Sequence, residues 1–283
     1  MMYNLITTGQ EAPARLAAIL SGVFDVPAGD VDVSEESDFD SRNWDAEVTC
    51  EYSVVRGDLN WSMSIYATDA VQSPPSEETL ALKVARSLGA AVLFPGAETV
   101  PSIWRVATPQ GALTHARVTE PESESERLTV DAVEESIPDF PRAAVTKFPE
   151  IIKELQLPSE VTDSHLPEGI SEDLREVRGL LVNWERLTVR MAANWPPSAW
   201  YPASIYVEDL ELRDQMADVI EQLSEGQRQS AREALEQIDQ AYRELTVEDG
   251  GVNLAKAADV PMADRAWYWY RRPVNPPWNC PGN

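Results

Sequence analysis

The chain has 283 residues, and its 48 acidic side chains against 23 basic ones give a formal net charge of −25. A negative field of this size repels nucleic acid and anionic membrane surfaces, and it attracts basic proteins. Hydrophobic residues make up 43% of the sequence and include nine tryptophans, so the chain can bury ordinary cores. A disordered acidic tail is therefore excluded.

The N-terminus and the cysteines predict a cytoplasmic protein. Met1-Met2-Tyr3-Asn4 has neither the basic nor the apolar run of a secretory signal. No apolar run approaches the roughly 20 residues that a membrane-spanning helix needs. Cys50 and Cys280 lie far apart and form neither a metal pair nor a disulfide framework.

The first half of the sequence alternates between helical and strand periodicity. Apolar spacing predicts a helix over 16–24, and Ser76 caps a second helix that ends at Gly89. Period-two alternation predicts a hairpin of two strands, 47–55 and 59–65. Further short strands are expected at 91–94, 103–107 and 113–119.

These elements, with the composition, divide the chain into three parts. Residues 1–120 predict a two-layer α+β domain, a mainly antiparallel sheet with helices on one face. Residues 121–170 are rich in proline and open with the acidic run 121–126, so we expect a connecting segment. Residues 171–283 predict a mostly α-helical bundle with an aromatic C-terminal extension.

Three apolar stripes with helical spacing predict the helices of this bundle. Pro196-Pro197 closes the first stripe, and Ser224 with Gln227 three residues later forms a capping box that opens the third. The short connection there sets the second and third helices antiparallel. The stripes run over 174–195, 212–223 and 231–245.

Acidic residues of the first domain form one candidate partner-binding surface. Asp38-x-Asp40 has the spacing of a calcium loop, yet Asn43 replaces the required glycine and Thr49 replaces the bidentate glutamate. We therefore expect no metal and a solvated loop beside a solvated hairpin face. The alternative is that the loop and the polar face of the hairpin form a docking surface for a basic partner. The candidate residues are Asp38, Asp40, Asp45, Glu47 and Glu51.

The aromatic C-terminus forms a second candidate surface. Four consecutive aromatics, 267–270, precede two arginines and cannot all point the same way. Docking on the bundle can bury two of them, while the others and the arginines form an amphipathic edge of residue types enriched at hot spots. The net charge opposes single-stranded nucleic acid as its ligand. The candidate contacts are Trp267, Trp269, Arg271 and Arg272.

The sequence carries no catalytic constellation. Its two histidines, His115 and His165, are isolated, and we expect them at the surface or rim. Glycine-rich phosphate loops are absent. Adjacent carboxylates at 134–135 and 208–209 are expected by chance among 48 acidic residues. A non-enzyme without cofactor or metal is therefore expected.

Three stretches carry a resemblance. Asn43-Trp44-Asp45, Cys50-Glu51-Tyr52 and the tryptophan-rich end resemble uncharacterised two-domain proteins of actinobacterial, streptomycete type, some of which belong to toxin–immunity loci. The resemblance extends loosely over the chain and transfers no functional residue to it. It implies an immunity protein.

Three functions follow from these observations. The favoured one is an acidic immunity or inhibitor protein that blocks a basic toxin or effector by steric occlusion, with encounter accelerated roughly 10–1000-fold by charge. The alternative is an assembly or adaptor subunit that binds a structural partner through the bundle and the aromatic terminus. The third is a carboxylate enzyme of unfamiliar type, which a deep pocket with carboxylates of raised pKa would favour.

Overall fold

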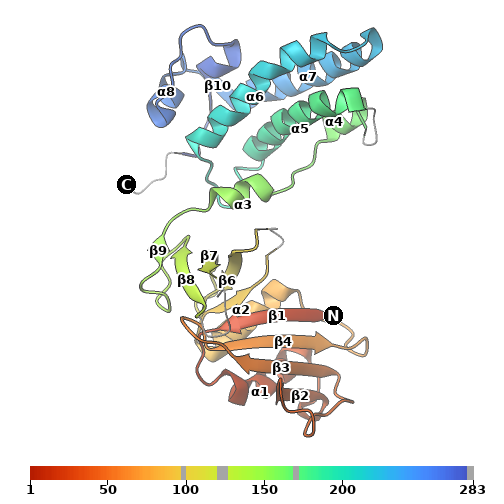
Figure 1. Cartoon of the computed structure of the whole chain (residues 1–283), viewed down its shortest axis with the longest axis vertical. Helices are drawn as coiled ribbons and strands as arrows, with labels where there is room; N and C mark the ends of the chain where they lie inside the picture. The colour runs from red at the N-terminus through yellow and green to blue at the C-terminus, as the bar shows by residue number, and fades with distance from the viewer. Residues whose placement is uncertain (97–99, 120–126, 168–171, 279–283) are drawn as a thin grey trace. The chain divides into compact units, whose positions relative to one another are not determined.

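The computed structural model describes residues 1–96, 100–119, 127–167 and 172–278 (Figure 1). The chain divides into two compact units, Met1–Phe148 and Pro149–Asn283. The expected connecting segment, 121–170, is split between them, because its described parts contain two strands of the first unit and two helices of the second. Pro121–Glu126 and Cys280 lie outside the described residues.

The first unit is built on a nine-stranded sheet with the order β2-β3-β4-β1-β5-β6-β7-β8-β9. All neighbouring strands are antiparallel except the pairs β2–β3 and β8–β9. The strands are β1 (Met2–Thr7), β2 (Val31–Glu35), β3 (Val48–Val54), β4 (Trp61–Ala67), β5 (Val92–Phe94), β6 (Ile103–Ala107), β7 (Leu113–Thr119), β8 (Thr129–Val133) and β9 (Ala144–Val145).

Two helices, α1 (Ala12–Phe24) and α2 (Glu77–Leu88), cover one face of this sheet, and a short 3-10 turn, η1 (Ala28–Asp30), follows α1. As predicted, Ser76 caps α2 by accepting the Thr79 N–H at 3.2 Å, and Gly89 ends the helix in the left-handed region. Because strand side chains alternate, the buried residues that face these helices come from every second position. They include Tyr3, Leu5, Val48, Cys50, Met63 and Ile65, packed against Leu16, Leu20, Leu80 and Val84.

The opposite face of the sheet has its own smaller core beneath the loop that follows β8. Ile137 and Phe140 of that loop pack with Leu93, Val106 and Val118 from the strands. Both faces are therefore partly covered, by helices on one side and by a loop on the other. The expectation of a mixed helix-and-sheet protein with an N-terminal sheet is confirmed at this level.

The second unit is mainly helical, and Figure 1 draws α5, α6 and α7 close together. The helix α5 packs against both α6 and α7, and the capping box predicted at Ser224 is present. No helix in the described part of the chain is long and apolar enough to cross a membrane. The elements are α3 (Pro149–Glu154), α4 (Glu160–His165), α5 (Glu172–Ala192), α6 (Ala203–Glu221), α7 (Glu225–Leu245), β10 (Thr246–Glu248), α8 (Val252–Ala258), η2 (Trp267–Tyr270) and β11 (Arg271–Pro273).

The aromatic terminus is ordered structure rather than the irregular extension that the sequence predicts. Its four aromatics form the 3-10 turn η2, and the next residues form β11, which pairs with β10. The buried Tyr242 hydroxyl lies 2.5 Å from that of Tyr206 and donates to the Tyr268 carbonyl at 3.0 Å. This chain of hydroxyls ties the terminus to α6 and α7.

Candidate functional site

The acidic loop, residues 36–45, leaves the end of β2 and leads to the start of its parallel neighbour β3. Since Val31 and Val33 belong to the core beneath the helices, Asp32 and Glu51 point to the opposite face of the sheet. The Asn43 N–H donates to Asp32 at 3.0 Å. The loop therefore lies over the face that the two helices leave uncovered.

Arg42 holds this loop in shape. Its side chain is only 5% exposed, although it belongs to a surface loop. Its Nε donates to the Asp38 carbonyl at 2.8 Å, and Nη2 donates to the carbonyls of Glu35 and Glu36 at 3.2 and 2.9 Å. Nη1 forms an ion pair with Glu51 on β3. One guanidinium thus satisfies two loop carbonyls and the last carbonyl of β2, and it fastens the loop to the sheet.

Two large aromatic side chains stand out of the loop beside this guanidinium. The Phe39 ring is centred 4.8 Å from the Arg42 Cζ and the Trp44 ring 5.5 Å from it. Phe39 is nevertheless 64% exposed and Trp44 69% exposed. Aromatic side chains held in place and left in water are the usual anchors of protein–protein interfaces.

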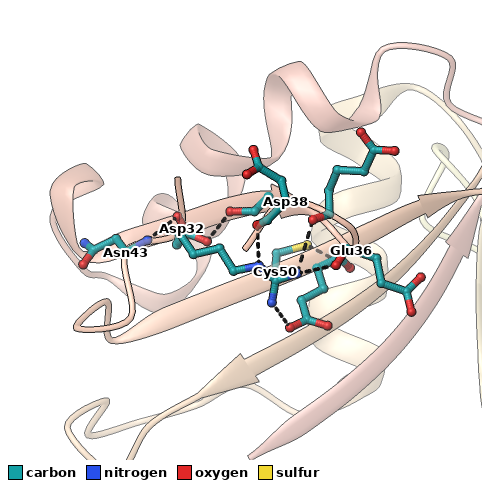
Figure 2. Close-up of polar contacts among 9 residues, drawn as sticks. Asp32, Glu36, Asp38, Asn43 and Cys50 are labelled. Carbon is teal, nitrogen blue, oxygen red and sulfur yellow. Dashed lines mark hydrogen bonds and ion pairs between the residues drawn. The ribbon is translucent and has the colours of Figure 1, made fainter. Parts of the chain in front are cut away.

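Carboxylates surround these aromatics. Residues 36–45 contain four acidic side chains and one arginine, a local charge of −3. Asp38, Asp40 and Asp45 are all exposed, and a hydrogen bond from the Ser41 hydroxyl holds the pKa of Asp38 below its ordinary value. Figure 2 shows Asp32, Glu36, Asp38 and Asn43 gathered where the loop meets the strands. Among the described residues, no three His, Cys, Asp or Glu side chains are grouped to hold a metal ion.

The predicted hairpin residues meet the loop at one point. Glu51 lies opposite Ser64 on β4 and accepts the Arg42 ion pair, so it belongs to the same surface as the loop. Glu47 is half-buried just before β3, and its carbonyl accepts the Thr68 N–H at 2.9 Å. The structure therefore joins Glu51 to the acidic loop directly. Glu47 lies between the end of the loop and the start of β3.

The predicted aromatic contact residues have structural roles. Trp269 is 0% exposed, and its indole N–H donates to Asp214 at 3.0 Å. The prediction that Trp269 contacts a partner is therefore wrong. Trp269 is buried because η2 turns it into the bundle, where a carboxylate satisfies its one donor. Trp267 is half-buried, with the Arg243 guanidinium 3.9 Å from its ring centre.

The two arginines that follow, Arg271 and Arg272, also make contacts within the second unit. Arg271 donates to the Thr246 hydroxyl at 2.8 Å and to the carbonyls of Arg243 and Thr246. Arg272 donates to the carbonyls of Pro273 and Val274, both at 2.9 Å. Both guanidinium groups therefore bind backbone carbonyls, Arg271 those where α7 meets β10 and Arg272 those that follow it in the chain.

The expectation of a surface or rim position for His115 is wrong. His115 is buried on β7, and its Nδ1 lies 2.6 Å from Glu134 Oε2. Cys50, a free thiol, is also buried, and burial raises its pKa to about 12. A thiol with that pKa is a packing residue rather than an activated nucleophile.

The second unit contains a cavity of about 480 Å³ lined by α3, α5, α6 and the segment before α6. Asp209, one of the adjacent carboxylates noted in the sequence, lies in its wall and is 6% exposed. Tyr201 donates to Asp209 at 2.5 Å, with Asn183 and Arg190 close by. Burial raises the pKa of Asp209 to about 7. This combination is the feature expected of the carboxylate-enzyme hypothesis.

Comparison with protein-family models, curated proteins and solved structures gives no match for this chain. The resemblance to streptomycete-type proteins therefore depends on the quoted residues alone. The sequence indicated the carboxylates of the acidic loop, but not the exposure of Phe39 and Trp44 or the contacts of Arg42 that hold the loop. The available signal was two large aromatics inside a strongly acidic run without strand or helix periodicity.

Proposed function

We propose that this protein binds a basic protein through the acidic loop and blocks it sterically, as an immunity or inhibitor protein does to a cationic toxin or effector. The single observation that carries the proposal is the exposure of Phe39 and Trp44 on a loop fixed by Arg42 and ringed by carboxylates. The carboxylates would steer a cationic partner, and the aromatics would supply the desolvated contact.

The rigidity of the loop supports this role. Arg42 satisfies two loop carbonyls and the last carbonyl of β2 before any partner arrives, so little conformational entropy remains to be lost on binding. The assembly or adaptor alternative has less support, since Trp269 of the aromatic terminus is buried. The proposal requires no catalytic step and no cofactor.

The test first asks whether a gene beside that of this protein encodes a basic polypeptide, and surface plasmon resonance then measures binding to that polypeptide. Neighbouring genes that encode no basic polypeptide would count against the immunity role. The double variant Phe39→Ala/Trp44→Ala should weaken binding about 30-fold or more, the range of a hot-spot truncation. Val252→Ala, an exposed hydrophobic residue on α8 of the second unit, is the control and should bind as the wild type does. Association should slow steeply as salt rises.

Polylysine serves as a probe for charge alone. It should bind the wild type and the double variant equally, because the variant keeps every carboxylate. If the neighbouring basic polypeptide also binds both proteins equally, the aromatics are not the contact and the proposal fails. An association rate that does not change with salt concentration would favour the adaptor alternative instead.

A further inference from the structure

The cavity of the second unit has the size and lining of a small-molecule site. Its volume of about 480 Å³ falls within the range of roughly 300–1,000 Å³ that is typical of ligand pockets. Apolar side chains and a small set of polar ones share its wall, the mixture that such pockets use for affinity and orientation. The apolar lining residues are Ile152, Leu155, Val182, Leu187, Ile205 and Leu212.

The charge of the cavity wall is opposite in sign to that of the whole chain. Lys153, Arg186 and Arg190 face Glu208 and Asp209, so three positive and two negative groups leave +1 with every group ionised. The complete chain carries −25. A local excess of cations in so acidic a protein favours an anionic ligand at this place.

Of the three cations in the cavity wall, Arg186 has the most donors available for a ligand. Lys153 is paired with Glu208 at 2.9 Å, and Arg190 donates to the carbonyls of Pro196 and Ile152 at 2.7 and 3.0 Å. Arg186 uses only its Nε, which donates to the Leu157 carbonyl at 2.9 Å. Within the described part of the chain its two terminal nitrogens have no partner. Such a guanidinium fork matches a carboxylate bidentately.

Asp209 is a poor counter-ion for a cationic ligand. It already accepts the Tyr201 hydroxyl at 2.5 Å and lies beside Arg190. Burial also raises its pKa to about 7, so near neutral pH it carries a proton for much of the time. The wall of the cavity therefore offers the two terminal nitrogens of Arg186 rather than a free Asp209 carboxylate.

Gly179 keeps the cavity open from the middle of α5. Glycine weakens a helix interior, and its usual structural reason is a close neighbour that leaves no room for a side chain. Here a Cβ added at Gly179 would meet no heavy atom within 4 Å. The residue lines the cavity, so its missing side chain leaves volume there.

From these contacts we infer that the cavity binds a small amphipathic organic anion, a monocarboxylate whose head pairs with Arg186 and whose apolar body lies against the aliphatic wall. The inference is independent of the acidic loop and of its proposed partner. It assigns binding and no reaction, because Asp209 is engaged by Tyr201.

Three probes with the same tail and different heads test this assignment: decanoate, decylamine and decanol. Isothermal titration of the full chain should show saturable decanoate binding, about tenfold or more tighter than decanol, the effect of a charge-assisted hydrogen bond. Decylamine should bind more weakly than decanoate. No saturable decanoate binding, or a preference for decylamine, would overturn the assignment.

Two variants locate the binding. Gly179→Leu fills the cavity from a helix position with open space, so it should fold with an unchanged or higher melting temperature and lose decanoate binding about tenfold or more. Arg186→Gln should lose the preference for decanoate over decanol, whereas Arg175→Gln, an exposed arginine on the same helix, should keep it. Undiminished decanoate binding by folded Gly179→Leu would place the ligand elsewhere and refute the inference.

Discussion

Replacing Asp209 by asparagine should change how the stability of the second unit depends on pH. The carboxyl is buried, and its pKa is raised from 3.8 to about 7. Between these values the folded protein holds a proton that the unfolded chain has released. Stability therefore falls as pH rises from about 4 to about 7, and it stays level above that.

The size of the effect follows from the same two values. A rise of about three pKa units corresponds to about 4 kcal/mol of stability over the whole window. About 2.5 kcal/mol of this falls between pH 5 and pH 8, where the protein can be studied conveniently. The variant lacks the titrating group, so its stability relative to wild type should rise by that amount between the two pH values.

Urea unfolding followed by tryptophan fluorescence measures this difference, because six of the nine tryptophans lie in residues 149–283. Asparagine keeps one acceptor for the Tyr201 hydroxyl and loses the second oxygen, a loss that does not depend on pH. The quantity to compare is therefore the slope with pH of the difference in unfolding free energy between variant and wild type, not the size of that difference at one pH. Asp218→Asn, an exposed carboxylate on the same helix, controls for the removal of one charge. A flat difference between pH 5 and pH 8 would refute the argument.

Two further substitutions test the packing around the sites. Arg42→Ala removes the donor to the carbonyls of Glu35, Glu36 and Asp38, so amide hydrogen exchange across 36–45 should accelerate. Arg142→Ala, a change at an exposed arginine of the same unit, should leave exchange in the loop unchanged. Tyr242→Phe leaves the buried Tyr206 hydroxyl without its partner and should cost about 2 kcal/mol, measured as a lower melting temperature; an unchanged melting temperature would contradict this.

Local patterns predicted those elements whose signals are local. The Ser76 cap and the Ser224 capping box depend on residues three positions apart, and both are present. The strand β1 was missed because its partners in the sheet, β4 and β5, follow it by many residues. The strand β8 was missed because the acidic, proline-rich composition around it indicated a connecting segment. It is held in the sheet by β7.

The candidate site shows the same division. An acidic surface could be predicted from composition, since carboxylates stay in water almost wherever the chain places them. The position of the Trp44 ring beside Arg42 could not, because Arg42 is itself held by an ion pair with Glu51 on β3. The burial of Trp269 could not either, since its partner Asp214 lies far away in the sequence. In both cases tertiary contacts fix the direction of the side chain, and the spacing of apolar residues along the sequence does not predict such contacts.

Net charge alone does not define where this molecule acts. At physiological ionic strength charges are screened over about 8 Å, so a ligand responds to the groups within one or two side chains of it. Within that distance the acidic loop offers carboxylates around exposed Phe39 and Trp44, whereas the cavity offers the unpaired fork of Arg186 beside an aliphatic wall. Under the two proposals, the same negative chain would bind a cationic partner at one surface and an anion in one pocket, and the arrangement of neighbouring side chains would decide which ligand each site takes.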